Sequence, residues 1–472
     1  MRLSPQLQHA IRAALLVVSR AGYLLSSLLL LLLLVRLMPL AEMDSFSLAQ
    51  SWLAVLVVAF DFGLNEYMVR AVSAGGERSN PFKGALVAKA LLVVVVSAIY
   101  LLVAGLLYAG KGHFLVLLCT CGVAAARGLC DFAENALIAR GKTRAVFRFA
   151  TIQALAALGA GLLAAKFIGA TAVVVLESQI LIYAVLGILR LTQLDAFHPN
   201  GGDLRALGRA APGLILAAVP FGAMSVGGIL MANGPLIVMS TETRFVGSLA
   251  SFAAASRIWG AFLAFGQGPF TRLYAVFSMQ EASGESEASQ RLASRMVFPL
   301  GGLGLAISLG TILCGAPLMR WVWASKFPLA YQDFAILGAS LPFALGAYIP
   351  GAWLPARHRE REKMFLVVSL CALLWLCLWL TRHQLTETLA ACLLSGAWIV
   401  QSVAFWLMVS GKGGIKTGWL RPNFLPGIGL VVLAAGSASG VLGKLAGLLF
   451  GGFVLAANGI YYRRGSVEPA KD

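Results

Sequence analysis

Long apolar runs alternate with short polar joints along almost the whole chain. A helix that crosses the hydrocarbon core of a bilayer needs about 20 predominantly apolar residues, and most of these runs approach or exceed that length. The pattern predicts about fourteen membrane-spanning helices, over residues 13–35, 46–69, 84–108, 114–138, 145–165, 171–189, 211–239, 245–271, 296–319, 334–354, 364–380, 388–409, 424–440 and 442–462.

Positive residues gather on one side of this predicted topology. With the N-terminus in the cytoplasm, the inner joints carry roughly three times as many Lys and Arg residues as the outer joints, as the positive-inside rule requires. The sequence therefore predicts a multi-pass protein of the inner (plasma) membrane with both termini in the cytoplasm. The formal net charge of +17 indicates cytoplasmic loops rather than contact with nucleic acid.

The composition excludes most other protein classes. The chain is 59% hydrophobic and 12% charged, whereas soluble domains are about 45–50% apolar and about 25% charged. A soluble enzyme, a disordered chain and a nucleic-acid-binding domain are therefore excluded. The cysteines lie in apolar runs and the histidines lie in joints. No disulfide framework, metal site, catalytic residue or cofactor is predicted from them.

Polar joints divide the chain into parts. The fold class is predicted to be all-α and polytopic, with a six-helix bundle over residues 1–191, a cytoplasmic linker over 192–209, a second six-helix bundle over 210–410, and a helix pair with a tail over 411–472. Two similar halves of this kind are common in transporters. The polar, acidic joint over 278–294 is predicted to be a surface segment.

Several short motifs resemble those of one transporter family. They lie at residues 60–65 (FDFGLN) with Arg70 after them, 254–257 (AASR), 265–270 (FGQGPF), 314–317 (CGAP) and in the basic cluster 357–363. Together they resemble the polysaccharide transporter family within the MATE/MOP flippase superfamily. One departure is visible at 231–235 (MANGP), where many members carry an acidic residue.

The resemblance implies two MATE-like bundles and a flippase that works by alternating access. Its cargo would be an undecaprenyl-diphosphate-linked oligosaccharide repeat unit of an O-antigen, capsule or exopolysaccharide, carried from the cytoplasmic to the outer leaflet. The implied partners are this lipid-linked oligosaccharide, membrane lipid, and a polymerase and chain-length regulator of the same pathway. Because the cargo head holds sugars and diphosphate, its path should be polar and partly cationic.

Two other functions stay open on the same evidence. One is a MATE-type small-molecule exporter, or a flippase of a lipid-linked peptidoglycan precursor, on the same fold. The other is a membrane polysaccharide polymerase or ligase. Such an enzyme generally needs a sizeable external loop, and the longest predicted external joint runs only over 320–333. The protein is therefore expected not to be an enzyme.

Charges inside the predicted spans mark the candidate cargo path. An arginine at the bilayer centre costs about 2.5–3.5 kcal/mol on insertion scales, so each one needs an explanation. At a rise of about 1.5 Å per residue, Arg20 and Asp61 lie roughly 12 and 13 Å from the same membrane edge, on adjacent helices. They are predicted to meet, either in a cargo cavity or as a structural pair that holds the two helices together.

Further charges lie in other spans. Arg257 is predicted near the midplane, as a cargo contact or as a buried bridge between helices. Arg127, Asp131 and Glu134 share one helix face, which is either a polar wall of the path or a set of mutually neutralising charges. Lys89 is predicted to extend its amine to the cytoplasmic interface.

The seventh predicted span is rich in proline and glycine. Proline removes a helix hydrogen bond and clashes with the preceding turn. A bend at Pro220, Gly222, Gly234 and Pro235 is therefore predicted to act as a hinge. The alternative is close packing of this helix through its glycines.

Overall fold

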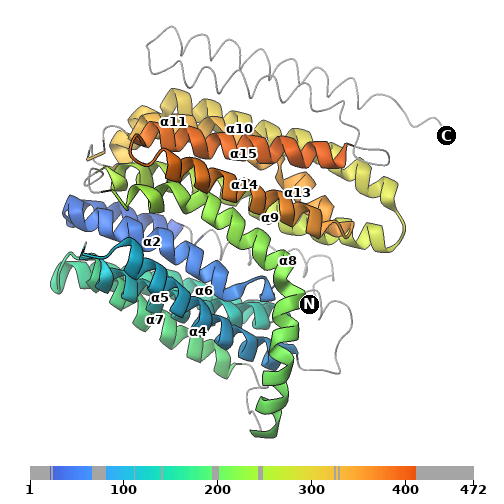
Figure 1. Ribbon diagram of the computed structural model, residues 1–472, viewed down its shortest axis with the longest axis horizontal. Helices are drawn as coiled ribbons and strands as arrows, with labels where there is room; N and C mark the ends of the chain where they lie inside the picture. The colour runs from blue at the N-terminus through green and yellow to red at the C-terminus, as the bar shows by residue number, and fades with distance from the viewer. Residues whose placement is uncertain are drawn as a thin grey trace, which may run out of the picture. The chain divides into compact units, whose positions relative to one another are not determined.

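The computed structural model describes residues 22, 25–65, 81–110, 112–139, 142–193, 201–242, 248–323, 326–327 and 330–410. All regular secondary structure in these residues is helical (Figure 1). The chain forms two compact units, Met1–Ala250 and Ser251–Asp472, each with its own internal packing.

The helices confirm the predicted fold class. Among the described residues, ten helices are long and apolar enough to cross a membrane, and shorter apolar helices cover Leu25–Leu37 and Leu249–Leu263. Together they coincide with the first twelve predicted spans. The last two predicted spans, 424–440 and 442–462, lie outside the described residues, as does the whole of the predicted C-terminal part from 411 onward.

The first unit is built around α2 (Leu40–Asp61). Its other labelled helices are α4 (Pro81–Leu107), α5 (Phe114–Ala139), α6 (Thr143–Phe167), α7 (Ala172–Thr192) and α8 (Gly201–Met239). Helix α2 packs against α4, α5, α7 and α8, and 67% of its most apolar window is buried, against 17% for α4. In the first turn of α2, Glu42 accepts a hydrogen bond from the Ala172 amide at 2.8 Å and so caps α7.

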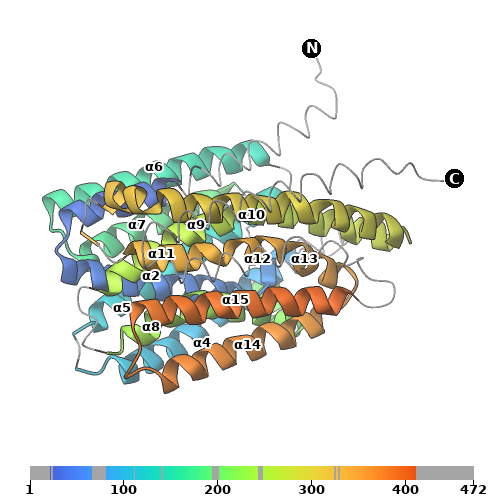
Figure 2. The same cartoon turned by 90° about the horizontal axis from the view of Figure 1, so that it is seen from above.

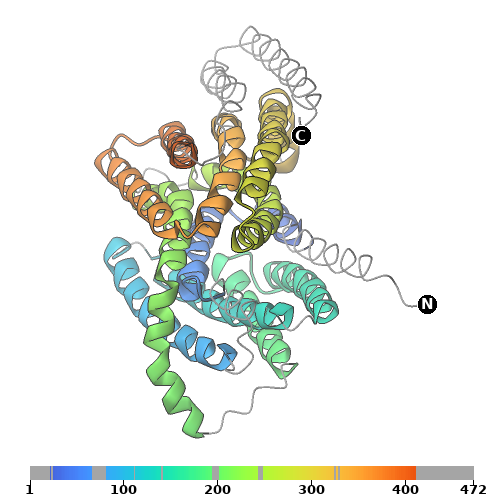
Figure 3. The same cartoon turned by 90° about the vertical axis from the view of Figure 1, so that its right-hand side faces the viewer.

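Helix α8 packs within the first unit, against α2 and α4 (Figure 3). The sequence analysis assigned most of this helix to the second bundle and its first residues to the linker over 192–209. In the structure the helix already begins at Gly201, and the boundary between the units falls after it, at Ala250. Small residues such as Gly222 allow α8 to lie close to α2.

The second unit contains the remaining helices. These are α9 (Leu249–Ala282), which begins just before the boundary, α10 (Ser286–Trp323), α11 (Ala330–Ala339), α12 (Leu341–Gly346), α13 (Tyr348–Ala356), α14 (Glu360–Leu380) and α15 (Glu387–Val409). The single span predicted over 334–354 is thus three short helices in succession. Pro342 and Pro350 lie in the first turns of α12 and α13, where a residue without an amide hydrogen is best tolerated.

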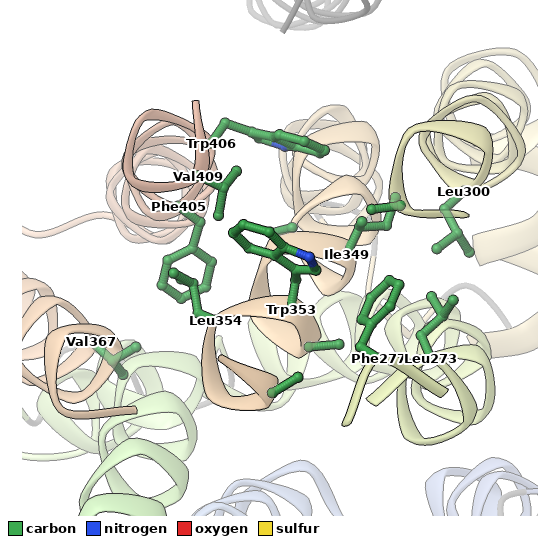
Figure 4. Packing of buried hydrophobic residues seen from close by; sticks show 14 residues of the cluster. Leu273, Phe277, Leu300, Ile349, Trp353, Leu354, Val367, Phe405, Trp406 and Val409 are labelled. Atoms are coloured by element: carbon green, nitrogen blue, oxygen red, sulfur yellow. The ribbon is translucent and has the colours of Figure 1, made fainter. Parts of the chain in front are cut away.

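A buried aromatic cluster anchors one end of this unit. Trp353 lies between Phe277 of α9 and Phe405 and Trp406 of α15 (Figure 4). Its indole nitrogen donates to Ser289 Oγ on α10 at 2.9 Å, so the buried polar atom is satisfied. The broken α11–α13 segment, 89% buried in its apolar window, is the centre of the second unit.

The segment over 278–294, predicted to be a surface joint, is the tip of a helical hairpin. Helix α9 ends at Ala282, Gly284 turns the chain with a φ of 77°, and α10 begins at Ser286. The 38 residues of α10 correspond to about 57 Å, well beyond a hydrocarbon core of about 30 Å. Figure 2 shows this end of α10 extending past α13 and α15.

Candidate functional site

The candidate site of the first unit lies where α2 ends. Asp61 is the last residue of α2, and its carboxylate accepts a hydrogen bond from Lys89 Nζ of α4 at 2.9 Å. Lys89 is only 4% exposed, and its amine also lies 5.6 Å from the centre of the Phe132 ring on α5. The prediction that this lysine extends to the interface is therefore wrong, because it is buried and bonded to the partly buried carboxylate of Asp61. Arg20, the partner predicted for Asp61, lies outside the described residues.

The FDFGLN motif forms the turn that follows this pair. Phe62 and Gly63 have positive φ angles of 42° and 74°, so the α2 helix stops directly after Asp61. A Cβ atom on Gly63 would lie 2.6 Å from the amide nitrogen of Gly222, and one on Gly222 would lie 2.6 Å from Phe62 O. The two glycines therefore allow backbone-to-backbone packing of α2 against α8.

This contact bears on the hinge predicted in α8. The helix is continuous from Gly201 to Met239 through Pro220 and Pro235. Gly222 serves close packing, which is the alternative that the sequence left open for it. Gly234 and Pro235 are buried, and a hinge at these positions stays a prediction. Asn233, within the 231–235 stretch, donates to Ile229 O of its own helix at 3.0 Å.

The packing at Gly222 gives a sharp mutational test. Gly222→Ala is expected to lower the folded yield and the melting temperature, because overpacking against backbone typically costs about 1–3 kcal/mol. Gly228→Ala is the matched control on the same helix, since its added Cβ would meet nothing within 4 Å. Size-exclusion profiles and thermal melting in detergent measure both effects. Equal stability of the two variants would contradict the close approach.

The charges on α5 are neutralised in two ways. Arg127 Nε lies 3.8 Å from Asp131 Oδ2 one turn along the helix, with both side chains about one-third exposed or less. Glu134 instead pairs across helices, with Arg190 Nη2 of α7 at 3.1 Å. The shared face of Arg127 and Asp131 is thus paired along the helix, whereas Glu134 binds α7 to α5.

Arg190 is a buried residue that the sequence analysis treated as a loop charge. Its side chain is 0% exposed, and Nη1 donates to Cys130 O at 3.2 Å. The guanidinium also lies 5.8 Å from the centre of the Phe149 ring on α6. One arginine therefore connects α5, α6 and α7. The signal that could have revealed it is its position directly after a predicted apolar span that ends three residues before α7 does.

Arg257 belongs to the second unit, on α9. Its side chain is partly buried. Two residues later, Trp259 donates to Ser340 Oγ at 3.2 Å and packs edge-on against Trp398 of α15 at 5.7 Å. Because residues two apart do not face each other on a helix, Arg257 and Trp259 lie on different faces of α9. The role of Arg257 in a cargo path stays a prediction.

The second unit also contains an acid pair that the sequence did not reveal. Asp333 on α11 is 1% exposed, and the acid beside it is Glu387, at the start of α15. The two carboxyl groups belong to helices that pack against each other. The sequence analysis placed Asp333 at the end of an external joint, but it lies inside α11. Among the described residues, no group of three His, Cys, Asp or Glu could hold a metal ion.

Comparisons with known proteins identify the fold. No protein-family model matches the sequence, and no curated protein matches it either. The solved structure of the lipid II flippase MurJ in an inward closed conformation matches with a TM-score of 0.68 and 14% identity, covering 97% of this chain and 100% of that chain. An inward-facing multidrug resistance MATE transporter matches with a TM-score of 0.60 and 14% identity over 82% of this chain and 93% of that one.

A third match is a MOP superfamily transporter from Pyrococcus furiosus, with a TM-score of 0.55 and 14% identity over 84% of this chain and 94% of that one. The three structures share one architecture. The chain therefore has the fold of the MOP superfamily of transporters and flippases, and it is a multi-pass membrane protein.

Proposed function

We propose that this protein is a flippase for undecaprenyl-diphosphate-linked oligosaccharide repeat units, acting by alternating access in polysaccharide biosynthesis. The observation that supports it best is the extent of the likeness to MurJ, which covers 97% of this chain and the whole of that one. The likeness to the multidrug MATE transporter covers 82%. A lipid-linked cargo is therefore favoured over a small soluble one.

The choice of an oligosaccharide rests on the motifs that resemble the polysaccharide transporter family. The most specific of them, FDFGLN, has a structural reason here, because its glycine packs against Gly222 and its aspartate pairs with Lys89. The alternative, a flippase for the peptidoglycan precursor lipid II, is favoured by the name of the MurJ match itself. The two functions share a diphosphate and differ in the sugar.

The proposal also covers the membrane in which the protein acts and the residues that contact its cargo. The protein acts in the inner membrane with both termini in the cytoplasm. Its cargo path includes Arg257 in one unit, and Asp61, Arg127 and Asp131 in the other, together with Arg20. Arg257 contacts the diphosphate or an acidic sugar during crossing. A polymerase and a chain-length regulator consume the exported unit.

The experiment compares cargoes in reconstituted vesicles. Undecaprenyl-diphosphate oligosaccharide, lipid II and a cationic drug are each offered, and the rate at which the head group becomes accessible on the opposite side is measured. Faster crossing of the oligosaccharide than of the other two is expected. Crossing of lipid II alone would replace the proposal by the precursor flippase, and crossing of the drug alone would replace it by an exporter.

Variants of Arg257 test its proposed contact with the cargo. Arg257→Ala is expected to slow crossing by about ten- to a hundredfold, because a hydrogen bond to a charged group contributes roughly 1.5–3 kcal/mol. Arg257→Lys should retain part of the rate, since it keeps the charge and loses the planar fork. Arg320→Ala, at an exposed arginine of α10, is the control. An unchanged rate for Arg257→Ala would remove this residue from the path.

A further inference from the structure

The exposed face of α10 changes from charged to apolar along the helix. One continuous stripe of exposed residues follows the helix at spacings of three and four. Its apolar part starts at Pro299, continues through Leu303 and Leu313, and ends at Trp321, which is 75% exposed. From Pro299 to Trp321 the helix rises about 33 Å, close to the hydrocarbon thickness of about 30 Å. Tryptophan is also the residue typical of a membrane interface.

Two arginines continue the same stripe beyond its apolar part. Arg295 lies one turn before Pro299, and Arg291 lies one turn before Arg295; both side chains are exposed. They are about 6 and 12 Å past the apolar edge along the helix. The head-group layer is about 5–8 Å thick on each side, and an arginine side chain can bend back toward it. Both guanidinium groups therefore reach the level of the lipid head groups.

Within the part of the chain that the structure describes, the ion pairs involve residues other than Arg291 and Arg295. Glu287 lies one turn before Arg291, and the described ion pairs do not join these two residues either. Two neighbouring cations are therefore exposed on one face of α10 without an ion pair to a described residue.

The arrangement recurs in the first unit. Arg144 and Arg148, again one turn apart and exposed, precede the exposed apolar residues Ile152 and Leu155 of α6. Arg144 is in the first turn of α6, where the positive end of the helix dipole disfavours a cation. A local anion would offset that cost. The repetition on an unrelated helix indicates a common use rather than chance.

We infer that Arg291 and Arg295 on α10, and likewise Arg144 and Arg148 on α6, bind the phosphate head groups of anionic phospholipids in the adjacent leaflet. Juxtamembrane cations contribute about 1 kcal/mol each at an anionic membrane surface, and paired guanidinium groups suit the geometry of phosphate. The site lies on the lipid-facing surface and does not depend on which cargo crosses the protein.

The test measures lipid retention by native mass spectrometry after purification in mixed micelles of phosphatidylglycerol and phosphatidylcholine. The variant Arg291→Gln with Arg295→Gln is expected to weaken phosphatidylglycerol retention by about five-fold per arginine, with phosphatidylcholine unaffected. The double lysine variant should keep most of the binding, because the positive charges remain. Arg144→Gln with Arg148→Gln should cause a comparable and additive loss.

Glu287→Gln is the matched control, since it removes an exposed charge from the same stripe and should not weaken retention. In the unmodified protein, added salt should lower phosphatidylglycerol retention, because exposed charges are screened. Undiminished phosphatidylglycerol retention by the glutamine variants would overturn the inference. If those variants did not fold, salt-independent retention by the unmodified protein would overturn it as well.

Discussion

Replacement of Arg190 by methionine is expected to destabilise the first unit strongly. The guanidinium is fully buried, pairs with Glu134 at 3.1 Å and donates to Cys130 O at 3.2 Å. Methionine fills a similar volume but leaves the carboxylate without its cation. Breaking a buried ion pair from one side costs about 3–5 kcal/mol, and a typical domain is stable by only about 5–15 kcal/mol.

The same reasoning predicts a rescue. Arg190→Met combined with Glu134→Gln removes both charges, and the double variant should recover much of the lost stability, because no uncompensated charge stays buried. Arg209→Met is the control, at an exposed arginine of α8 in the same unit. Membrane yield and the melting temperature in detergent separate the variants. A double variant no more stable than Arg190→Met alone would show that the packing of the side chain matters more than its charge.

The helical architecture follows from the sequence because each span is an apolar run of sufficient length. Twelve of the predicted spans coincide with described helices or helical segments. Their ends are less certain, and at Arg190 an error of a few residues decided the interpretation. The predicted span over 171–189 ends just before it, whereas α7 continues to Thr192. A residue that seemed to belong to a cytoplasmic joint is instead fully buried.

Breaks inside the spans were harder to predict than the spans. The segment over 334–354 has the apolar content of a single helix, and mean hydropathy does not register where Pro342 and Pro350 restart it. The role of a glycine is also hard to predict. The sequence alone does not show that Gly222 is a packing residue, because the space left for a Cβ atom there depends on which helix lies opposite.

Which charges form pairs also depends on which helices are neighbours, and the sequence alone does not give this. Counting residues from a membrane edge gives the level of a charge but neither the neighbouring helices nor the face that the side chain occupies. Glu134 shares a helix face with Arg127, yet its partner is on α7. Asp333 is a further case, since its partner Glu387 is far away in sequence and meets it only through the packing of α11 on α15.

The final expected result concerns the partner of Asp61. The depth estimate pairs it with Arg20, whereas the structure pairs it with Lys89 at 2.9 Å. Lys89→Met and Asp61→Asn should each destabilise the first unit, because each leaves a charge in a mostly buried site. Combining them should cost less than the sum of the two. A coupling of about 1–3 kcal/mol is expected from thermal or denaturant unfolding, as for contacting residues.

Arg20→Met provides the decisive comparison. If Lys89 alone is the partner of Asp61, the effect of Arg20→Met should add to that of Asp61→Asn within about 0.5 kcal/mol, because the effects of residues that share no contact are additive. The reverse result, with coupling to Arg20 and additivity with Lys89, would establish the pair deduced from depth and contradict the one in the structure. Coupling to both would mean that Asp61 changes partners between conformations. In that case Asp61→Asn should slow crossing more than its loss of stability explains. A carboxylate that alternates between two cations affects the change between conformations as well as the stability of the fold.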